Sequence, residues 1–423
     1  MISNKYVIIG SSAAALGCIN GIRLFDKTNE ITVISSDNKI IYSRPIIAEA
    51  LGDEKYAKKI VYIYSEDLIK SNKINFIENA EIKKIDPVSK TIFSKKGAEF
   101  HFEKLLIGTG GKPIMPSVKT GGQTESKILT FTNMQDLARL KDIILYRNIK
   151  SATVVGAGFI GLEVADALSK NNIAVNIVEL ASRPLIRSAD EYISEKVTTQ
   201  LKKRNINIYT NESVDSIENN QKDKLDITLK SGKFFESDII IFSIGVKPDL
   251  NIVNQSGIKT NSGIVINEKC ETNIKDIFAA GDVVEILDIS TNKIYPVPLW
   301  VWAFEAGLTA GTNMTGAERF FKGGYPLSPL KFSDIPIVSA GDLFNEKSEI
   351  LIYKLEKRNI YEKILVTGNR ITGFIMTGTS IQKSGILSYL LKNRFDISII
   401  KDKLLLPDFS VADLPEKWRY ENE

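Results

Sequence analysis

The stretch Val7-Ile8-Ile9-Gly10-Ser11-Ser12-Ala13-Ala14-Ala15 predicts an apolar strand that runs into a turn of small residues and then a helix. The pattern returns as Thr153-Val154-Val155-Gly156-Ala157-Gly158-Phe159-Ile160-Gly161. Small residues let the backbone of such a turn approach a pyrophosphate, and the following helix offers free N–H groups and the positive end of its dipole. Two such turns predict two bound dinucleotides.

Both stretches are followed, later in the chain, by the same kind of ending. Ile107-Gly108-Thr109-Gly110-Gly111-Lys112-Pro113 and Phe242-Ser243-Ile244-Gly245-Val246-Lys247-Pro248 are each an apolar strand that turns through Gly-x-Lys-Pro. One glycine fingerprint is a weak signal, but a shared beginning and a shared ending indicate a repeat of whole domains. A third signature, Ile277-Phe278-Ala279-Ala280-Gly281-Asp282, follows the second unit.

The composition is that of an ordinary globular protein. The 423 residues exceed what one core usually serves, and 43% of them are hydrophobic and 25% charged. The net charge of +4 comes without a basic run interleaved with aromatics, which argues against nucleic-acid binding. No apolar run reaches the roughly 18 residues of a membrane span. A strand that begins by Tyr6 leaves no room for a signal peptide, so we expect a cytoplasmic protein.

Hydrophobic periodicity predicts the order of elements along the chain. We expect a helix over Thr132–Arg147 capped by Asn133, a helix near Ser188–Arg204 and a buried helix over Trp302–Met314. Near the C-terminus an antiparallel sheet and a final helix are expected over Ile350–Leu355, Ile360–Val366, Ile371–Met376 and Ser380–Asn393. This predicts a discontinuous first domain (1–112 and 245–322), a second domain (113–244) and a third (323–423).

Taken together, these motifs resemble those of the FAD-dependent pyridine nucleotide-disulfide oxidoreductase superfamily, the two-dinucleotide-binding-domain flavoproteins, over nearly the whole chain. The segment from Tyr42 to Glu49, Tyr-Ser-Arg-Pro-Ile-Ile-Ala-Glu, is similar to the Arg-Pro segment of its rubredoxin-reductase-like and nitrite-reductase-like NADH dehydrogenases. The resemblance implies an α/β fold with two Rossmann-like domains and a small α+β C-terminal domain. In the family that last domain covers the flavin and often makes the dimer contact, so a homodimer is expected.

The resemblance assigns FAD to the first fingerprint, NAD(P)H to the second, and the ribityl chain of FAD to Asp282. The expected cofactor-binding residues are Gly10, Ser12, Ala13, Ala14, Ser35, Arg44, Pro45, Thr109, Gly110, Gly156, Gly158, Phe159, Ile160, Gly161, Glu179, Gly245, Gly281, Asp282, Leu299 and Trp300. The first fingerprint departs from the family pattern, because Ser12 and Ala15 replace its second and third glycines. Ser35, with Asp37 two residues on, stands where an acidic residue usually binds the adenosine ribose.

The second unit has the usual acidic residue, Glu179, at the end of the strand that follows its fingerprint. A carboxylate there accepts hydrogen bonds from ribose hydroxyls and repels a 2′-phosphate, which favours NADH. The alternative interpretation of Glu179 is a solvated glutamate in a loop. The nearby Arg183 could bind a 2′-phosphate, so NADPH remains an alternative to NADH.

Two glutamates are the expected catalytic residues. Glu163, in Gly161-Leu162-Glu163, has the position that in the family approaches the nicotinamide and flavin N5. Many members place a lysine opposite it, but this chain has Glu49 there. Two neighbouring carboxylates would raise the pKa of one of them by repulsion, so the family's lysine–glutamate pair does not transfer.

The positions of the cysteines decide between classes of reaction. A disulfide reductase or a water-forming NADH oxidase needs a redox thiol above the flavin, yet no cysteine lies between Ile19 and Lys269. We interpret Cys18 as a small buried residue of the first helix and Cys270 as a loop residue. We interpret the single histidine, His101, as a surface residue of a strand. One histidine and two separated cysteines cannot supply a set of metal ligands, so no metal is expected.

These residues predict an FAD-dependent NAD(P)H oxidoreductase. Hydride would pass from NADH to the flavin, and electrons would leave for a small carrier protein of the rubredoxin or ferredoxin type. A peroxide-forming NADH oxidase, in which oxygen takes the electrons, is the alternative enzyme. A flavin-based redox switch that acts through the C-terminal domain is the alternative from another class.

Overall fold

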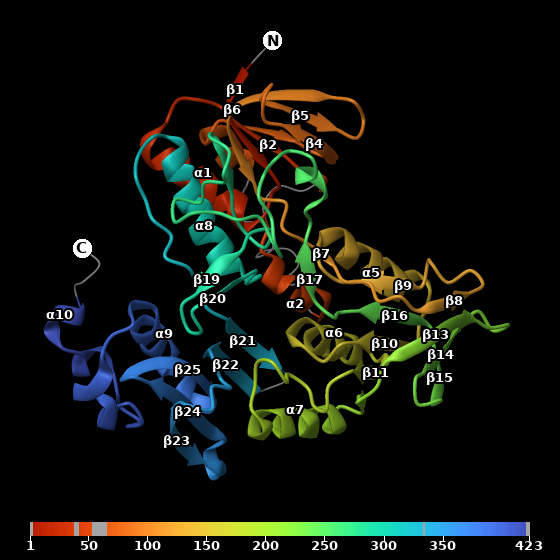
Figure 1. The fold of residues 1–423 in the computed structure, drawn as a ribbon. Coiled ribbons are helices and arrows are strands. Elements are labelled where there is room, and N and C mark those ends of the chain that lie inside the picture. The colour runs from red at the N-terminus through yellow and green to blue at the C-terminus, as the bar shows by residue number, and fades with distance from the viewer. Residues whose placement is uncertain (1–2, 38–41, 53–65, 333–334, 420–423) are drawn as a thin grey trace.

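The computed structural model describes residues 3–37, 42–52, 66–332 and 335–419 (Figure 1). Two mainly parallel sheets with helices are followed by an antiparallel sheet near the C-terminus. This confirms the α/β fold class expected from the sequence. Within the described ranges, no helix combines the length and the apolar character needed to cross a membrane.

The first sheet contains the strands of the first nucleotide unit. Its parallel strands lie in the order β3-β2-β1-β6-β18, and the antiparallel strands β4 and β5 extend it beside the first half of β6. The bounds are β1 (Ser3–Ile9), β2 (Ile31–Ile34), β3 (Ile74–Ile77), β4 (Ile82–Asp86), β5 (Thr91–Ser94), β6 (Glu99–Ile107) and β18 (Ile277–Ala279). Because β18 pairs with the second half of β6, the Gly281-Asp282 signature reaches the same sheet edge as the first fingerprint.

Helices α1 (Ala13–Phe25) and α8 (Trp300–Met314) pack side by side against this sheet (Figure 1). A Cβ on Gly307 would lie 2.1 Å from the Ala14 carbonyl oxygen, and one on Gly311 would lie 2.1 Å from that of Cys18. Only glycine permits this approach, and the order of the contacts shows that the two helices run in the same direction. Both N-termini therefore lie at the same end of the pair.

The second unit is a five-stranded parallel sheet in the order β12-β11-β10-β16-β9. Its elements are β9 (Ile128–Thr130), α5 (Met134–Tyr146), β10 (Ser151–Val155), α6 (Phe159–Lys170), β11 (Ala174–Glu179), α7 (Glu191–Lys203), β12 (Asn207–Thr210) and β16 (Ile239–Phe242). Asn133 caps α5 as predicted, because its side chain accepts a hydrogen bond from the Asp136 N–H at 2.8 Å. Helix α7 begins at Glu191 rather than near Ser188, because Asp190 is the residue that caps it.

Smaller sheets connect these units. Strands β7 (Gly111–Pro113) and β17 (Val246–Pro248), the two Gly-x-Lys-Pro endings, pair antiparallel with each other. A four-stranded sheet, β15-β14-β13-β8, flanks the second unit, and β19 pairs with β20. Their bounds are β8 (Lys119–Gly121), β13 (Val214–Asn219), β14 (Leu225–Leu229), β15 (Phe234–Ser237), β19 (Ile286–Asp288) and β20 (Lys293–Tyr295).

The C-terminal sheet is antiparallel, with strand order β21-β22-β25-β24-β23. Its strands and helices are β21 (Leu327–Phe332), β22 (Ile335–Gly341), β23 (Glu349–Leu355), β24 (Ile360–Thr367), β25 (Arg370–Thr377), α9 (Ser384–Asn393) and α10 (Glu416–Arg419). The other short helices of the described residues are α2 (Ile47–Gly52), α4 (Glu66–Ser71), and the 3-10 turns Arg44–Ile46, Asn251–Val253, Glu356–Arg358, Gly378–Lys383, Ile397–Ile399, Lys401–Lys403 and Val411–Asp413. The three expected C-terminal strands are confirmed.

Candidate functional site

The first fingerprint forms a tight turn at the carboxyl end of β1. Gly10 has a φ of +107°, and a Cβ on it would lie 2.1 Å from the Gly108 carbonyl oxygen. Only glycine fits between these two loops. Ser12 is the N-cap of α1, and its hydroxyl makes no capping hydrogen bond. Ser12, Ala13 and Ala14 thus lead into a helix N-terminus suited to a pyrophosphate.

The loop after β2, where the adenosine ribose is expected, contains the polar residues Ser35 and Asp37. The Ser35 hydroxyl lies 2.8 Å from the Ser11 hydroxyl and accepts the Asp37 N–H at 3.0 Å. Asp37 Oδ2 accepts a hydrogen bond from the Tyr42 hydroxyl at 3.0 Å. Asp37 Oδ1 is buried and has no hydrogen-bond partner in the described part of the chain. Asp37 is therefore a better candidate than Ser35 for binding a ribose hydroxyl.

The segments expected around the flavin also contain buried polar atoms without hydrogen-bond partners among the described residues. Arg44 Nε, Thr109 Oγ1 and Trp300 Nε1 are buried, and none has a hydrogen-bond partner among the described residues. Unpaired buried polar groups are unfavourable, so a ligand with many hydrogen-bonding atoms fits them. Gly110, with a φ of +72°, faces open space.

Asp282 lies at the turn that leaves β18, where Gly281 has a φ of +88°. Burial raises the pKa of the Asp282 carboxyl to about 6, while the charge of Arg44 acts to lower it. The charge of Arg44 thus acts on Asp282, although the two residues are far apart in sequence. This half-buried carboxylate is suited to accept hydrogen bonds from ligand hydroxyls. The donors and acceptors present thus fit FAD, with Leu299 as the N-cap of α8 beside Trp300.

The second fingerprint has the same geometry as the first. Gly156 has a φ of +105°, and a Cβ on Gly161 would lie 2.0 Å from the Gly156 carbonyl oxygen. Gly158 is the N-cap of α6, and a Cβ on it would meet no atom within 4 Å. The Ser243 hydroxyl, at the carboxyl end of β16, is buried without a hydrogen-bond partner in the described ranges. Phe159 and the exposed Ile160 begin α6, and Gly245 turns with a φ of +103°.

Glu179 ends β11, and its carboxylate is bound to two backbone N–H groups. Oε2 accepts from Ala157 at 2.6 Å and Oε1 accepts from Ala181 at 2.8 Å. The carboxylate therefore lies against the fingerprint turn, where a ribose would bind. Arg183, in contrast, donates to the Ala189 carbonyl at 2.8 Å and to the Ser194 hydroxyl at 2.6 Å. Its guanidinium is engaged within its own loop, which favours NADH over NADPH.

Glu163 and Glu49, the two expected catalytic residues, lie on neighbouring helices. Glu49 lies on α2 and Glu163 on α6, and these two helices pack against each other. Burial, and secondly the charge of Glu49, raise the pKa of the Glu163 carboxyl to about 7. At neutral pH this carboxyl can hold or release a proton.

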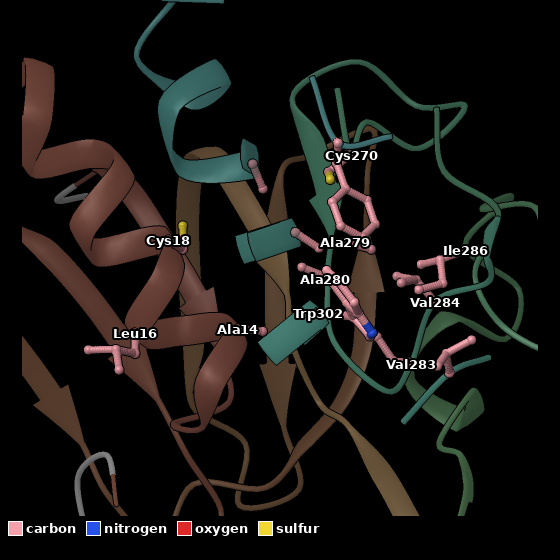
Figure 2. Close-up of a cluster of buried hydrophobic side chains, with 14 of the residues drawn as sticks. Ala14, Leu16, Cys18, Cys270, Ala279, Ala280, Val283, Val284, Ile286 and Trp302 are labelled. Carbon is pink, nitrogen blue, oxygen red and sulfur yellow. The ribbon is translucent and has the colours of Figure 1, made fainter. Parts of the chain in front are cut away.

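Both cysteines lie in the hydrophobic core of the first unit (Figure 2). Cys18 comes from α1 and donates to the Met314 sulfur at 3.6 Å, while Cys270 lies near β18. Burial raises the pKa of both thiols far above the ordinary value, which makes them poor nucleophiles. His101 is half-buried in β6 and its Nδ1 lies 3.0 Å from the Thr91 hydroxyl. In the described part of the chain, no three His, Cys, Asp or Glu side chains form a metal-ligand group.

Comparison with known proteins agrees with this geometry. The model of the pyridine nucleotide-disulphide oxidoreductase family matches residues 4–307. The chain belongs to this family. A second model, that of the rubredoxin NAD+ reductase C-terminal domain, matches residues 326–394. The protein is accordingly an FAD-dependent NAD(P)H oxidoreductase.

Two relatives cover most of this chain. A NADH oxidase of Methanocaldococcus jannaschii is 30% identical over 80% of this chain and 76% of the relative. A NADH-rubredoxin oxidoreductase of Clostridium acetobutylicum is 28% identical over 91% of this chain and 95% of the relative. The chain spans about half the length of a third relative, the nitrite reductase [NAD(P)H] of Bacillus subtilis, which is 25% identical over 93% of this chain and 48% of the relative.

Solved structures show the same fold. The putidaredoxin reductase in a covalent complex with putidaredoxin superposes with a TM-score of 0.84 at 19% identity, over 96% of each chain. The water-forming NADH oxidase of Lactobacillus brevis bound to NADH gives 0.83 at 22% identity, over 94% of this chain and 92% of that one.

Proposed function

We propose that the protein passes electrons from NADH, through bound FAD, to a small carrier protein of the rubredoxin or ferredoxin type. The observation that carries this proposal is the burial of both cysteines, with none between Ile19 and Lys269, because no thiol pair is left to relay electrons. The match to the rubredoxin NAD+ reductase C-terminal domain and the Clostridium acetobutylicum relative support a carrier protein as the acceptor.

In this proposal FAD supplies the two-electron chemistry, accepting hydride and releasing single electrons. The chain binds and orients its substrates. Asp282, Arg44, Thr109 and Trp300 would hold the flavin half of FAD, Asp37 its adenosine ribose, and Glu179 the ribose of NADH. The N-terminus of α8 would favour negative charge on the flavin. The Glu163 carboxyl would hold a proton that Glu49 makes easier to retain.

The domain division into 1–112 with 245–322, 113–244 and 323–423 remains part of the proposal, as does a homodimer formed through the third domain. The second candidate is a peroxide-forming NADH oxidase. The Methanocaldococcus jannaschii relative, a NADH oxidase, favours it. The candidates differ in the acceptor alone.

Steady-state assays of the FAD-loaded protein distinguish these candidates. NADH consumption is measured with rubredoxin, with ferredoxin and with oxygen as the acceptor, and peroxide is measured in the last case. We expect fast reduction of a carrier protein and slow oxygen consumption. Fast, stoichiometric peroxide formation would establish the oxidase, and slow turnover with every acceptor would support a redox switch.

A further inference from the structure

One tyrosine of the C-terminal sheet is bound to the second nucleotide unit. Tyr361, on β24, donates a hydrogen bond to Asp190 Oδ2 at 2.5 Å, and its side chain is only 5% exposed. Asp190 Oδ1 accepts the Ile193 N–H at 3.2 Å and so caps α7. Lys363 Nζ lies 3.6 Å from the same carboxylate. Figure 1 shows α7 beside the C-terminal sheet, where this contact is made.

Ring contacts strengthen the same junction. The Tyr361 ring lies 4.4 Å from the ring of Tyr192, measured between centroids. Lys354, from β23, places its ammonium 4.3 Å from the Tyr192 ring centroid. Lys196 of α7 donates to the Asn359 side-chain oxygen at 3.2 Å. The start of α7 is thus fixed by the C-terminal sheet on several sides.

The segment that leads to Asp190 holds the nucleotide-binding turn. Ala157, the second residue of the fingerprint turn, donates its N–H to Glu179 Oε2 at 2.6 Å and accepts the Leu185 N–H at 3.0 Å. Both backbone polar groups of Ala157 are therefore bound by residues 179–190. Leu185 adopts a φ of +55°, a conformation that bulky side chains rarely take without support.

Apolar packing along this segment is uneven, because Leu180 is 75% exposed and Ile186 37% exposed. The buried Leu185 and Ala189 and the hydrogen bonds of Arg183 hold its middle, and the hydrogen bonds of Glu179 and Asp190 hold its two ends. We propose that Tyr361 is a positioning residue for nicotinamide-dinucleotide binding, which acts by anchoring Asp190 and thereby residues 179–190 against the Ala157 turn. The inference rests on the proposed binding of NADH by this unit.

The physical effect is on affinity rather than on chemistry. When the Tyr361 hydroxyl is removed, the segment gains freedom, and ligand binding must then order it. The dissociation constant for NAD+ and the KM for NADH should both rise at least about five-fold. This is the lower limit of typical coupling between two distinct sites of a protein, about five-fold. The kcat at saturating NADH should stay unchanged, because Tyr361 touches no reacting atom in this proposal.

The test uses the full-length, FAD-loaded protein and the variant Tyr361→Phe. NAD+ affinity is measured by titration calorimetry, and KM and kcat are measured with an artificial acceptor such as ferricyanide. Amide hydrogen exchange is followed over residues 180–189. The matched control is Tyr389→Phe, which removes a tyrosine hydrogen bond of the same domain, to the Trp418 carbonyl at 2.5 Å. A second variant, Asp190→Asn, retains an acceptor for the cap and weakens the bond to Tyr361.

We expect weaker NAD+ binding and faster amide exchange in Tyr361→Phe, and a smaller effect in Asp190→Asn. The effects of these two substitutions should be non-additive in the double variant. Tyr389→Phe should change neither NAD+ binding nor amide exchange. Equal NAD+ affinity in Tyr361→Phe and the unmodified protein would overturn the inference, as would an equal loss in the control. A failure of the unmodified protein itself to bind NAD+ or to oxidise NADH would overturn the proposed function instead, so the two outcomes are separable.

Discussion

Glu163 and Glu49 are two acidic side chains held near each other on packed helices, and the second acts on the ionisation of the first. Burial is the larger cause and the Glu49 charge the smaller, and together they raise the pKa of Glu163 to about 7. The sequence does not give the size of this pKa shift. The presence of Glu49 where many family members have a lysine does indicate that the pKa of Glu163 is raised. A pair of this kind makes proton uptake depend on pH in the physiological range.

This relationship predicts a pH-dependent term in the stability of the FAD-loaded protein. Because the folded pKa of Glu163 is raised, its contribution to the free energy of unfolding is fully present below the unfolded value of about 4.3 and is lost as the pH rises through about 7. Thermal unfolding from pH 5 to 8 should therefore show a smaller decline in Glu163→Gln than in the unmodified protein. Glu49→Gln should reduce the decline partially, and the exposed Glu195→Gln should leave it unchanged. Identical profiles for Glu163→Gln and the unmodified protein would contradict the assignment.

The fold followed from the sequence wherever local signals were strong. The apolar run Tyr6–Ile9 with Gly10 and the cap at Asn133 specify their elements without help from distant residues. The helix expected over Ser380–Asn393 begins instead as a 3-10 turn, and α9 starts only at Ser384. The Ser380 hydroxyl binds the carbonyls of Thr377 at 2.8 Å and Tyr361 at 3.2 Å. Such side-chain bonds compete with a regular helix, and the one to Tyr361 depends on tertiary contacts.

The sequence predicted the general location of the candidate site, because glycine turns and an acidic residue after a strand are recognisable signals of dinucleotide binding. The choice between Ser35 and Asp37 was not predictable, because it depends on Ser11, whose hydroxyl lies against that of Ser35. The engagement of Arg183 by Ala189 and Ser194 was likewise invisible, since only the folded loop brings these groups together. The one available signal was that Asp37 is the only acid in the stretch Ser35-Ser36-Asp37-Asn38.

The loop after β2 gives a direct test of the ribose contact. Asp37→Asn should weaken FAD binding roughly ten-fold or more, because a charge-assisted hydrogen bond is worth about 1.5–3 kcal/mol. Ser35→Ala should weaken FAD binding less, through loosening of the loop. FAD dissociation constants from fluorescence titration of the flavin-free protein decide the order. A greater loss in Ser35→Ala would restore Ser35 as the ribose contact.

Asp282 should be required for retention of FAD. We expect yellow protein with one non-covalent FAD per chain. Asp282→Ala should lose most of its flavin on gel filtration, because a charged acceptor for ligand hydroxyls is removed. Asp282→Asn, which keeps one acceptor oxygen, should lose less. The ratio of absorbance at 450 nm to that at 280 nm gives the flavin content. Full flavin retention in Asp282→Ala would show that the carboxylate faces elsewhere.

Nucleotide preference should depend on Glu179 and not on Arg183. Glu179→Ala should narrow or reverse the preference for NADH, because it removes a ribose acceptor and the repulsion of a 2′-phosphate. Arg183→Met should mainly lower the melting temperature, since its guanidinium bonds to the protein's own loop. The ratio of kcat/KM for NADH to that for NADPH is the measurement. If Arg183→Met changed this ratio more than Glu179→Ala, the assignments of the two residues would have to be exchanged.

Activity should not depend on thiols, because both are buried and their pKa values are raised by that burial. The double variant Cys18→Ala with Cys270→Ala should keep most NADH-dependent reduction of ferricyanide. Alanine is the appropriate replacement here, since a serine hydroxyl in this core would be a buried polar group. An anaerobic reductive titration should take two electrons per FAD, with none stored in a disulfide or sulfenate. A requirement for four electrons, or loss of turnover in a variant that keeps its FAD, would place the protein among thiol-dependent reductases.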